Sequence, residues 1–114
     1  MLEEIKALGA NIDEGLKRFM NNSALYERCL KKYIAQAEKC NMLDEIQSGD
    51  FESAARSAHT MKGVASNLSL TPLYELYAEV VLRIRENNTE GLEEIAEKCI
   101  KIEKEFCDVI SKYQ

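Results

Sequence analysis

The sequence predicts an all-α fold: an antiparallel up-down-up-down four-helix bundle with short additional N-terminal helices. It contains one proline and five glycines, so little interrupts regular structure. Apolar residues recur three and four positions apart along most of the chain, which is the period of a helix, and no segment alternates as a strand does. The breaks between the long periodic segments are short, and short connections join antiparallel neighbours.

Two short helical segments open the chain. Apolar residues share one face of the first segment until Gly9 interrupts the pattern. Asn11 is suited to cap the second segment, and Glu14 stands at the position from which a side chain reaches back to the cap. We expect these turns to cover one end of the bundle.

The first two long helices are expected between residue 23 and about residue 68. Ser23 is a good N-cap for a helix that continues to about Ser48-Gly49. Asp50 can cap the next helix, which the sequence predicts to run to about Leu68. Its apolar residues recur at helical spacing and form one continuous face: Phe51, Ala54, Ala58, Met61, Ala65 and Leu68.

Two further long helices complete the bundle. Thr71-Pro72 marks a restart, because threonine caps well and proline is favoured at the first helical position. The stretch from Asn87 to Thr89 breaks the chain again, and an apolar stripe from Leu92 to Val109 predicts the last helix.

Composition excludes several classes of function. The formal net charge is −5 and both signs are scattered, whereas nucleic-acid surfaces gather lysine and arginine. No apolar stretch is long enough to span a bilayer, and Met1–Gly9 lacks the pattern of a signal peptide. The length of 114 residues fits one domain. We therefore expect a single helical domain over residues 1–114 that is cytoplasmic and binds neither nucleic acid nor membrane.

The four cysteines do not indicate a metal site. They form no C-x-x-C pair, and the chain has one histidine to assist them. Each lies among apolar positions of a helical pattern, so we interpret all four as small buried hydrophobic residues: Cys29, Cys40, Cys99 and Cys107.

The single histidine is expected on the surface of its helix. At about 100° per residue, the apolar face of this helix centres near Ala54 and Ala65. His59 points away from that face, among Arg56 and Thr60, and is therefore predicted to face solvent.

Small and polar residues surround the predicted histidine site. On the same side of the helix, or close to it, are Ala55, Arg56, Lys62, Gly63, Ser66 and Asn67. Glycine inside a helix lowers stability by about 0.5 to 1 kcal/mol relative to alanine, so its presence at position 63 needs an explanation. One explanation is that a bulky partner can then approach the imidazole closely. Lys62 can offset the charge of a phosphoryl group on the ring. This pattern suits phosphoryl transfer better than acid–base chemistry in a closed pocket.

Three motifs resemble one known family. The run Ala58–Gly63 (A-H-T-M-K-G) resembles the A-H-x-L-K-G signature of the histidine phosphotransfer (Hpt) domains of bacterial phosphorelays, with methionine in place of the usual leucine. Residues 12–19 with Leu25-Tyr26 resemble the N-terminal segment of the family, and Gly49-Asp50-Phe51 resembles the start of its active-site helix. The family often has glycine ten residues after the histidine, where this chain has Ser69.

The resemblance implies a role for three residues. His59 would accept the phosphoryl group on Nε2, Lys62 would neutralise it, and Gly63 would provide clearance. The implied partners are receiver domains of response regulators or hybrid histidine kinases, and the Mg²⁺ ion of the reaction would belong to the receiver. The chain would then be a phosphocarrier that needs no cofactor of its own. We expect it to be free-standing and monomeric.

Three other interpretations remain open. A helical docking module for a receiver domain or signalling protein, without phosphorylation, would keep the bundle and not need His59. An autonomous kinase or hydrolase is disfavoured, because the chain lacks a G-x-x-x-x-G-K phosphate loop with which to hold ATP. A purely structural spacer would leave Gly63 beside the only histidine unexplained.

Overall fold

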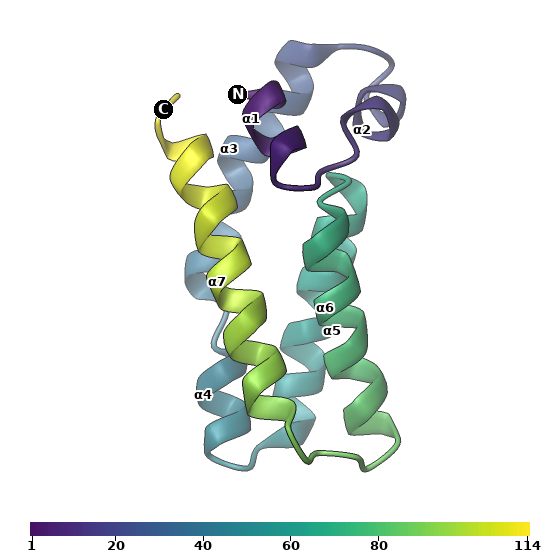
Figure 1. The fold of residues 1–114 in the computed structure, drawn as a ribbon, viewed down its shortest axis with the longest axis vertical. Helices are drawn as coiled ribbons and strands as arrows, with labels where there is room; N and C mark the ends of the chain where they lie inside the picture. The colour runs from purple at the N-terminus through teal and green to yellow at the C-terminus, as the bar shows by residue number, and fades with distance from the viewer.

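The computed structural model describes all 114 residues and contains helices and no strands, which confirms the predicted all-α fold. It has seven helices, one more than the sequence predicts. Figure 1 shows their arrangement. In chain order they are α1 (Leu2–Ala7), α2 (Ile12–Arg18), α3 (Ser23–Lys39), α4 (Met42–Gln47), α5 (Phe51–Asn67), α6 (Thr71–Arg85) and α7 (Leu92–Ser111).

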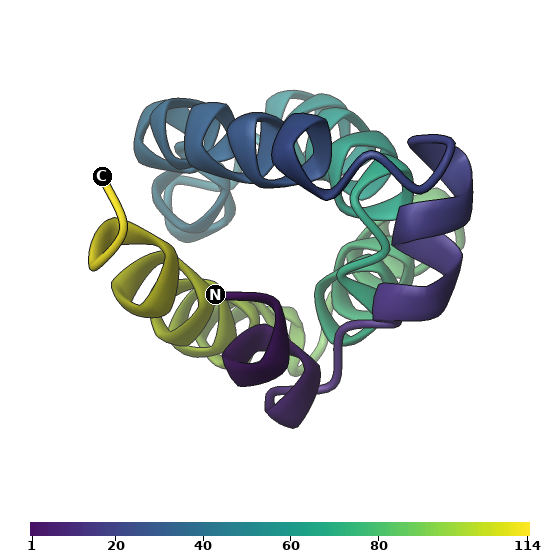
Figure 2. The same cartoon turned by 90° about the horizontal axis from the view of Figure 1, so that it is seen from above.

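The long helices form an antiparallel bundle. The α3–α4 pair, α5, α6 and α7 run alternately down and up the long axis of the molecule (Figure 1). Seen from above, they surround a common core (Figure 2). The most extensive packing joins α5 to α6, and α7 contacts α6, α4 and α3. The predicted up-down-up-down topology is confirmed. No helix has the length and apolarity that a membrane span requires.

The two N-terminal helices lie over one end of the bundle, as expected (Figure 1). The backbone N–H of Asn11 donates to the carbonyl of Ser69 at 2.9 Å, which joins the start of α2 to the turn between α5 and α6. Glu4 of α1 pairs with Lys112 at 2.5 Å and accepts a hydrogen bond from Tyr113. Both ends of the chain are thus attached to the same end of the bundle.

A single core of 24 buried apolar residues fills the bundle. Many of its largest fully buried side chains come from α3, α6 and α7: Tyr26, Leu30, Tyr33, Leu73, Tyr77, Leu92, Phe106 and Ile110. Burial of such surface is the main favourable contribution to folding. The cysteines are all free thiols, but the expectation that all four are buried is wrong, because only Cys99 is buried and the other three are half-buried.

The long helix expected from residue 23 to residue 48 is broken at Cys40, where the backbone is extended with ψ 124°. A continuous helix, at about 100° per residue, would turn Asn41 and Glu45 toward the core. The break shifts the phase so that Met42 and Ile46 are buried instead. The gain of apolar burial explains why α3 and α4 are separate.

Two of the four predicted caps are confirmed, and two are displaced. Asn11 accepts from the N–H of Glu14 at 3.2 Å, and Asp50 accepts from that of Ser53 at 3.2 Å. The cap of α3 is Asn22, whose Oδ1 accepts from the N–H of residue 25 at 3.0 Å, and Ser23 is the first helical residue. Likewise Thr71 is the first residue of α6 rather than its cap, with proline following it.

The turn between α5 and α6 explains why Ser69 is an unusual residue there. Its φ is +56°, in the left-handed region that favours glycine. Its Oγ donates to Oε1 of Glu14 at 2.9 Å, and its carbonyl accepts from Asn11. These two bonds offset the backbone strain and fix the C-terminal end of α5 to α2.

One charged residue, Glu103, lies in the core and connects three long helices. Tyr33 of α3 donates to its Oε1 at 2.9 Å and Tyr77 of α6 donates to its Oε2 at 2.5 Å. The side chain is on the apolar stripe of α7, and the residue is only 7% exposed. Burial raises the pKa of Glu103, because a low-dielectric interior disfavours the charged form.

The raised pKa of Glu103 leads us to predict how the stability of the protein depends on pH. A carboxyl whose pKa is raised on folding contributes stability at pH values below its unfolded pKa, and that contribution is lost as the pH rises through the folded pKa. Relative to the wild type, Glu103→Gln should therefore gain free energy of unfolding as the pH rises above the ordinary glutamate range. Urea unfolding of both proteins from pH 5 to 8 measures the difference. A difference that stays constant with pH would contradict it.

Candidate functional site

The helix α5 packs closely against neighbouring helices on one face and exposes the opposite face to solvent. Asp50 caps its first turn, and its inward positions include three alanines, Ala54, Ala58 and Ala65, all fully buried or nearly so. Small side chains let helices approach closely, which fits the extensive packing of α5 on α6. The outward residues of α5 therefore stand on a rigid support.

His59 is exposed near the middle of this outward face, as the helical pattern predicts. It takes part in no ion pair and in none of the side-chain hydrogen bonds. The residue next to it, Thr60, is also exposed. The imidazole is thus accessible to a second protein.

The six neighbours selected from the sequence all lie on the accessible side of α5. Arg56, Gly63 and Asn67 are exposed, and Ala55, Lys62 and Ser66 are half-buried.

The two nearby cations differ in how they are held. Arg56 is bound to its own helix: its guanidinium donates to Glu52 at 3.1 Å and to the Ser53 hydroxyl at 3.1 Å. Lys62 belongs to none of the six ion pairs of the protein. The ammonium of Lys62, one turn from His59, is therefore the cation that can turn to an anion on the ring without losing a partner.

Gly63 has no structural requirement within the chain. A Cβ added to it would meet no atom within 4 Å, and its φ is not in the left-handed region. Neither close packing nor backbone conformation explains the glycine. The position borders open space, one turn from His59.

A groove between α3 and α5 flanks the histidine face on one side. Two adjoining hollows of about 260 and 540 Å³ follow it. From α5 they are lined by Thr60, Val64 and Asn67, among others, and from α3 by Lys32, Gln36 and Lys39. The sequence alone does not identify which residues of the preceding helix flank the histidine face. Their spacing of four and three marks one helical stripe, but only the structure shows that this stripe borders α5.

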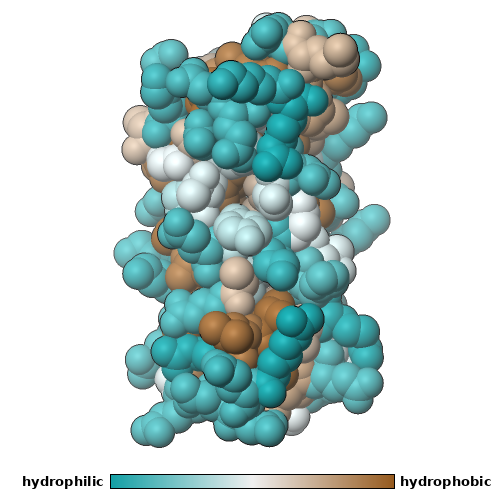
Figure 3. Space-filling view, turned by 90° about the vertical axis from the view of Figure 1, so that its right-hand side faces the viewer, coloured by the Kyte–Doolittle hydropathy of each residue, from teal (hydrophilic) through white to brown (hydrophobic).

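The other flank is formed by α6. Ser66 lines a hollow of about 280 Å³ together with Tyr74, whose side chain is partly exposed. Figure 3 shows the side of the bundle on which α5 and α6 lie: it is mostly hydrophilic, with a pale band across the middle and an apolar patch in the lower half. The helix α6 also carries Leu82, an apolar residue that is 55% exposed. A mixed surface of this kind is typical of transient interfaces.

These features define the chemistry that the face can perform. It offers one accessible nitrogen nucleophile, one unpaired ammonium group and open space beside them, without a closed pocket. No group of three or more His, Cys, Asp or Glu side chains could hold a metal ion. The arrangement suits transfer of a group that a partner brings to the ring.

Comparison with known proteins identifies the family. The chain matches the Hpt domain family over residues 2–111, which is nearly its whole length. It belongs to the Hpt domain family, whose members carry out histidine phosphotransfer in phosphorelays and interact with receiver domains. Among curated proteins and among solved structures, no significant match was found.

Proposed function

We propose that this protein is a phosphocarrier of a two-component phosphorelay, in which His59 reversibly takes a phosphoryl group from, or gives it to, an aspartate of a receiver domain. The observation that supports this most strongly is the exposure on α5 of the only histidine, in a chain that matches the Hpt family over residues 2–111. The proposal includes residues 1–114 as one functional domain in the cytoplasm.

The proposed reaction is a single in-line transfer. The lone pair of the His59 Nε2 attacks phosphorus, an N–P bond forms, and the P–O bond to the receiver aspartate breaks, which leaves a carboxylate on the receiver. The Mg²⁺ ion that neutralises the aspartyl phosphate belongs to the receiver. This chain contributes the nucleophile, its orientation and the local charge. The reverse reaction uses the same groups.

Lys62 is proposed to stabilise the phosphoryl group once it is on the ring. Charge-assisted hydrogen bonds are worth about 1.5 to 3 kcal/mol. We expect Lys62→Ala to slow transfer to His59 by about tenfold or more, as one tenfold step corresponds to about 1.4 kcal/mol. Single-turnover transfer from a phosphorylated receiver measures the rate. Lys101→Ala, at an exposed position on α7, is the matched control and should transfer at the wild-type rate; equal rates for the two variants would contradict the role of Lys62.

Gly63 is proposed to give the receiver clearance. Gly63→Gln should slow transfer markedly, because a long side chain would occupy the approach to the ring. It should not unfold the protein, since nothing lies within 4 Å and glutamine is the better helix former. Transfer rates and thermal unfolding of the same samples separate the two effects. A wild-type rate in the folded variant would show that clearance at this position is unnecessary.

The receiver is proposed to dock over the outward face of α5. The contacts assigned to α5 are Ala55, Arg56, Lys62, Gly63, Ser66 and Asn67, and α3 adds Lys32 and Gln36 from the adjoining groove. The contact is weak and transient, as a relay requires, and the carrier acts as a monomer.

The experiment that tests the proposal uses the purified chain, a phosphorylated receiver domain and Mg²⁺. Transfer should give a phosphorylated chain whose label is lost in acid and kept in alkali, as for a phosphoramidate. Stable binding of several unrelated receivers without transfer would instead indicate a docking module. Labelling that resists acid would contradict phosphorylation on histidine.

A further inference from the structure

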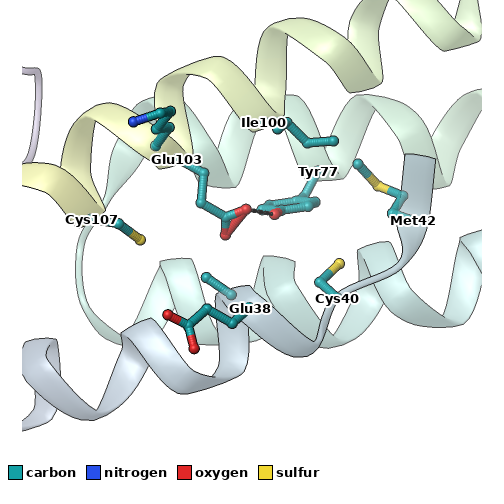
Figure 4. A pocket seen from close by; sticks show the side chains of 9 residues that line it. Glu38, Cys40, Met42, Tyr77, Ile100, Glu103 and Cys107 are labelled. Atoms are coloured by element: carbon teal, nitrogen blue, oxygen red, sulfur yellow. Dashed lines mark hydrogen bonds between the residues drawn. The ribbon is translucent and has the colours of Figure 1, made fainter. Parts of the chain in front are cut away.

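The break between α3 and α4 leaves a cavity on a different side of the bundle from the His59 face. The cavity has a volume of about 320 Å³ and opens to the surface. Residues of α3, α4, α6 and α7 line it, and no residue of α5 does. Figure 4 shows Cys40 and Met42 at the break, with Tyr77 and Ile100 on the opposite wall. A ligand in this cavity would therefore not contact the His59 face.

A buried carboxylate lies at the wall of the cavity. Glu103 projects into the space between Cys107 and Tyr77 (Figure 4), and each of its oxygens accepts one tyrosine hydrogen bond. A carboxylate can accept about four hydrogen bonds, so acceptor capacity remains. None of the six ion pairs of the protein includes Glu103. A buried carboxylate without a cation is costly, and a cation in the cavity would offset that cost.

The charges around the opening also favour a cation. Glu38 lines the cavity and is exposed. Lys104 is the one basic residue of the lining, and its ammonium is paired with Asp108 at 2.9 Å. The remaining wall is mainly apolar, with Ala37 and Met42 on one side. The cavity therefore combines negative charge at one point with an apolar surface around it.

We propose that this cavity binds a small organic cation, a primary amine on a compact apolar body. The ammonium group would donate to the Glu103 carboxylate, and the apolar body would lie against Met42 and Ile100. The volume is at the lower end of the range for small-molecule sites, about 300 to 1,000 Å³, which limits the ligand to a compact one. The tyrosine bonds of Glu103 connect α3, α6 and α7, but they do not account for the open space beside the carboxylate.

The test is an NMR titration of the full chain with benzylamine, benzyl alcohol and benzoate. Benzylamine should shift the backbone amides around Glu38, Ile100 and Glu103 in a saturable way. Benzyl alcohol and benzoate should bind at least about tenfold more weakly, because neither carries a positive charge that could form an ion pair with Glu103. His59→Gln should bind benzylamine as the wild type does, which keeps the result independent of phosphotransfer.

Substitution of Glu103 tests whether its charge is responsible for amine binding. Glu103→Gln should weaken benzylamine binding by about tenfold or more. The matched control Glu105→Gln, at an exposed position of the same helix, should leave it unchanged. Equal binding of amine and alcohol by the wild type would overturn the proposal even if Glu103→Gln did not fold. Unchanged amine affinity in folded Glu103→Gln, shifts confined to another part of the bundle, or no saturable binding would also overturn it.

Discussion

Replacing His59 by glutamine should abolish phosphoryl acceptance from a receiver, with a loss of at least about a thousandfold in rate. The glutamine amide is similar in size to the imidazole and is not a nucleophile, so chemistry is removed with little change of shape. The fold should be unaffected, because His59 is exposed and makes no hydrogen bond through its side chain. Surface substitutions of this kind usually change stability by less than about 0.5 kcal/mol.

Thr60→Ala is the matched control for this experiment. Thr60 is exposed on the same turn, and its side chain makes no hydrogen bond. The control should therefore accept phosphate at close to the wild-type rate. If folded His59→Gln still became labelled, another residue would have to carry the phosphoryl group.

Gly15→Ala should destabilise the fold by about 2 to 4 kcal/mol, through overpacking and the disturbance of a buried hydrogen bond. A Cβ at Gly15 would lie 2.4 Å from the hydroxyl oxygen of Tyr26. That hydroxyl cannot move freely, because Tyr26 is fully buried and donates to the carbonyl of Leu68 at 2.7 Å. The bond satisfies a carbonyl at the C-terminal end of α5, so its loss would also loosen the end of the histidine helix.

Gly63→Ala is a matched comparison that should raise the free energy of unfolding rather than lower it. Nothing lies within 4 Å of the added Cβ, and alanine is the better helix former by about 0.5 to 1 kcal/mol. Urea unfolding of both variants should show Gly15→Ala less stable and Gly63→Ala more stable than the wild type. Equal effects at the two glycines would mean that the contact of Gly15 with Tyr26 does not constrain the fold.

These glycines also show what sequence patterns can and cannot predict. The sequence places Gly63 inside a predicted helix beside the only histidine, and the structure shows that no internal contact requires glycine there. The close approach of Tyr26 to Gly15 depends on how α2 packs against α3, which local patterns do not specify. The N-terminal motif contains Gly15, but only the tertiary contact with Tyr26 explains why glycine is required there.

The helix boundaries illustrate the same difference. Bundle topology and the caps Asn11 and Asp50 followed from periodicity and capping chemistry, both of which are local. The break at Cys40 was missed, although the phase change from Ile34 to Met42 was a signal for it. Glu103 could have been noticed as a charged residue on an apolar stripe, since it follows Cys99 by four positions. Its tyrosine partners come from other helices and could not be predicted in this way.

The site was predictable where it depends on one helix. The exposure of His59 and the placement of its neighbours follow from helical geometry within α5. The groove on the α3 side depends on the relative position of two helices, so Lys32, Gln36 and Lys39 became candidates only with the structure.

The most direct test of the central claim is to locate the phosphate on the protein. The chain is phosphorylated by a receiver and Mg²⁺, and correlations between ³¹P and the imidazole nuclei are recorded by NMR in neutral or alkaline buffer. We expect one phosphorylated residue, His59, with phosphorus bonded to Nε2. Phosphorus bonded to any other residue, or a folded chain that no receiver phosphorylates, would contradict it.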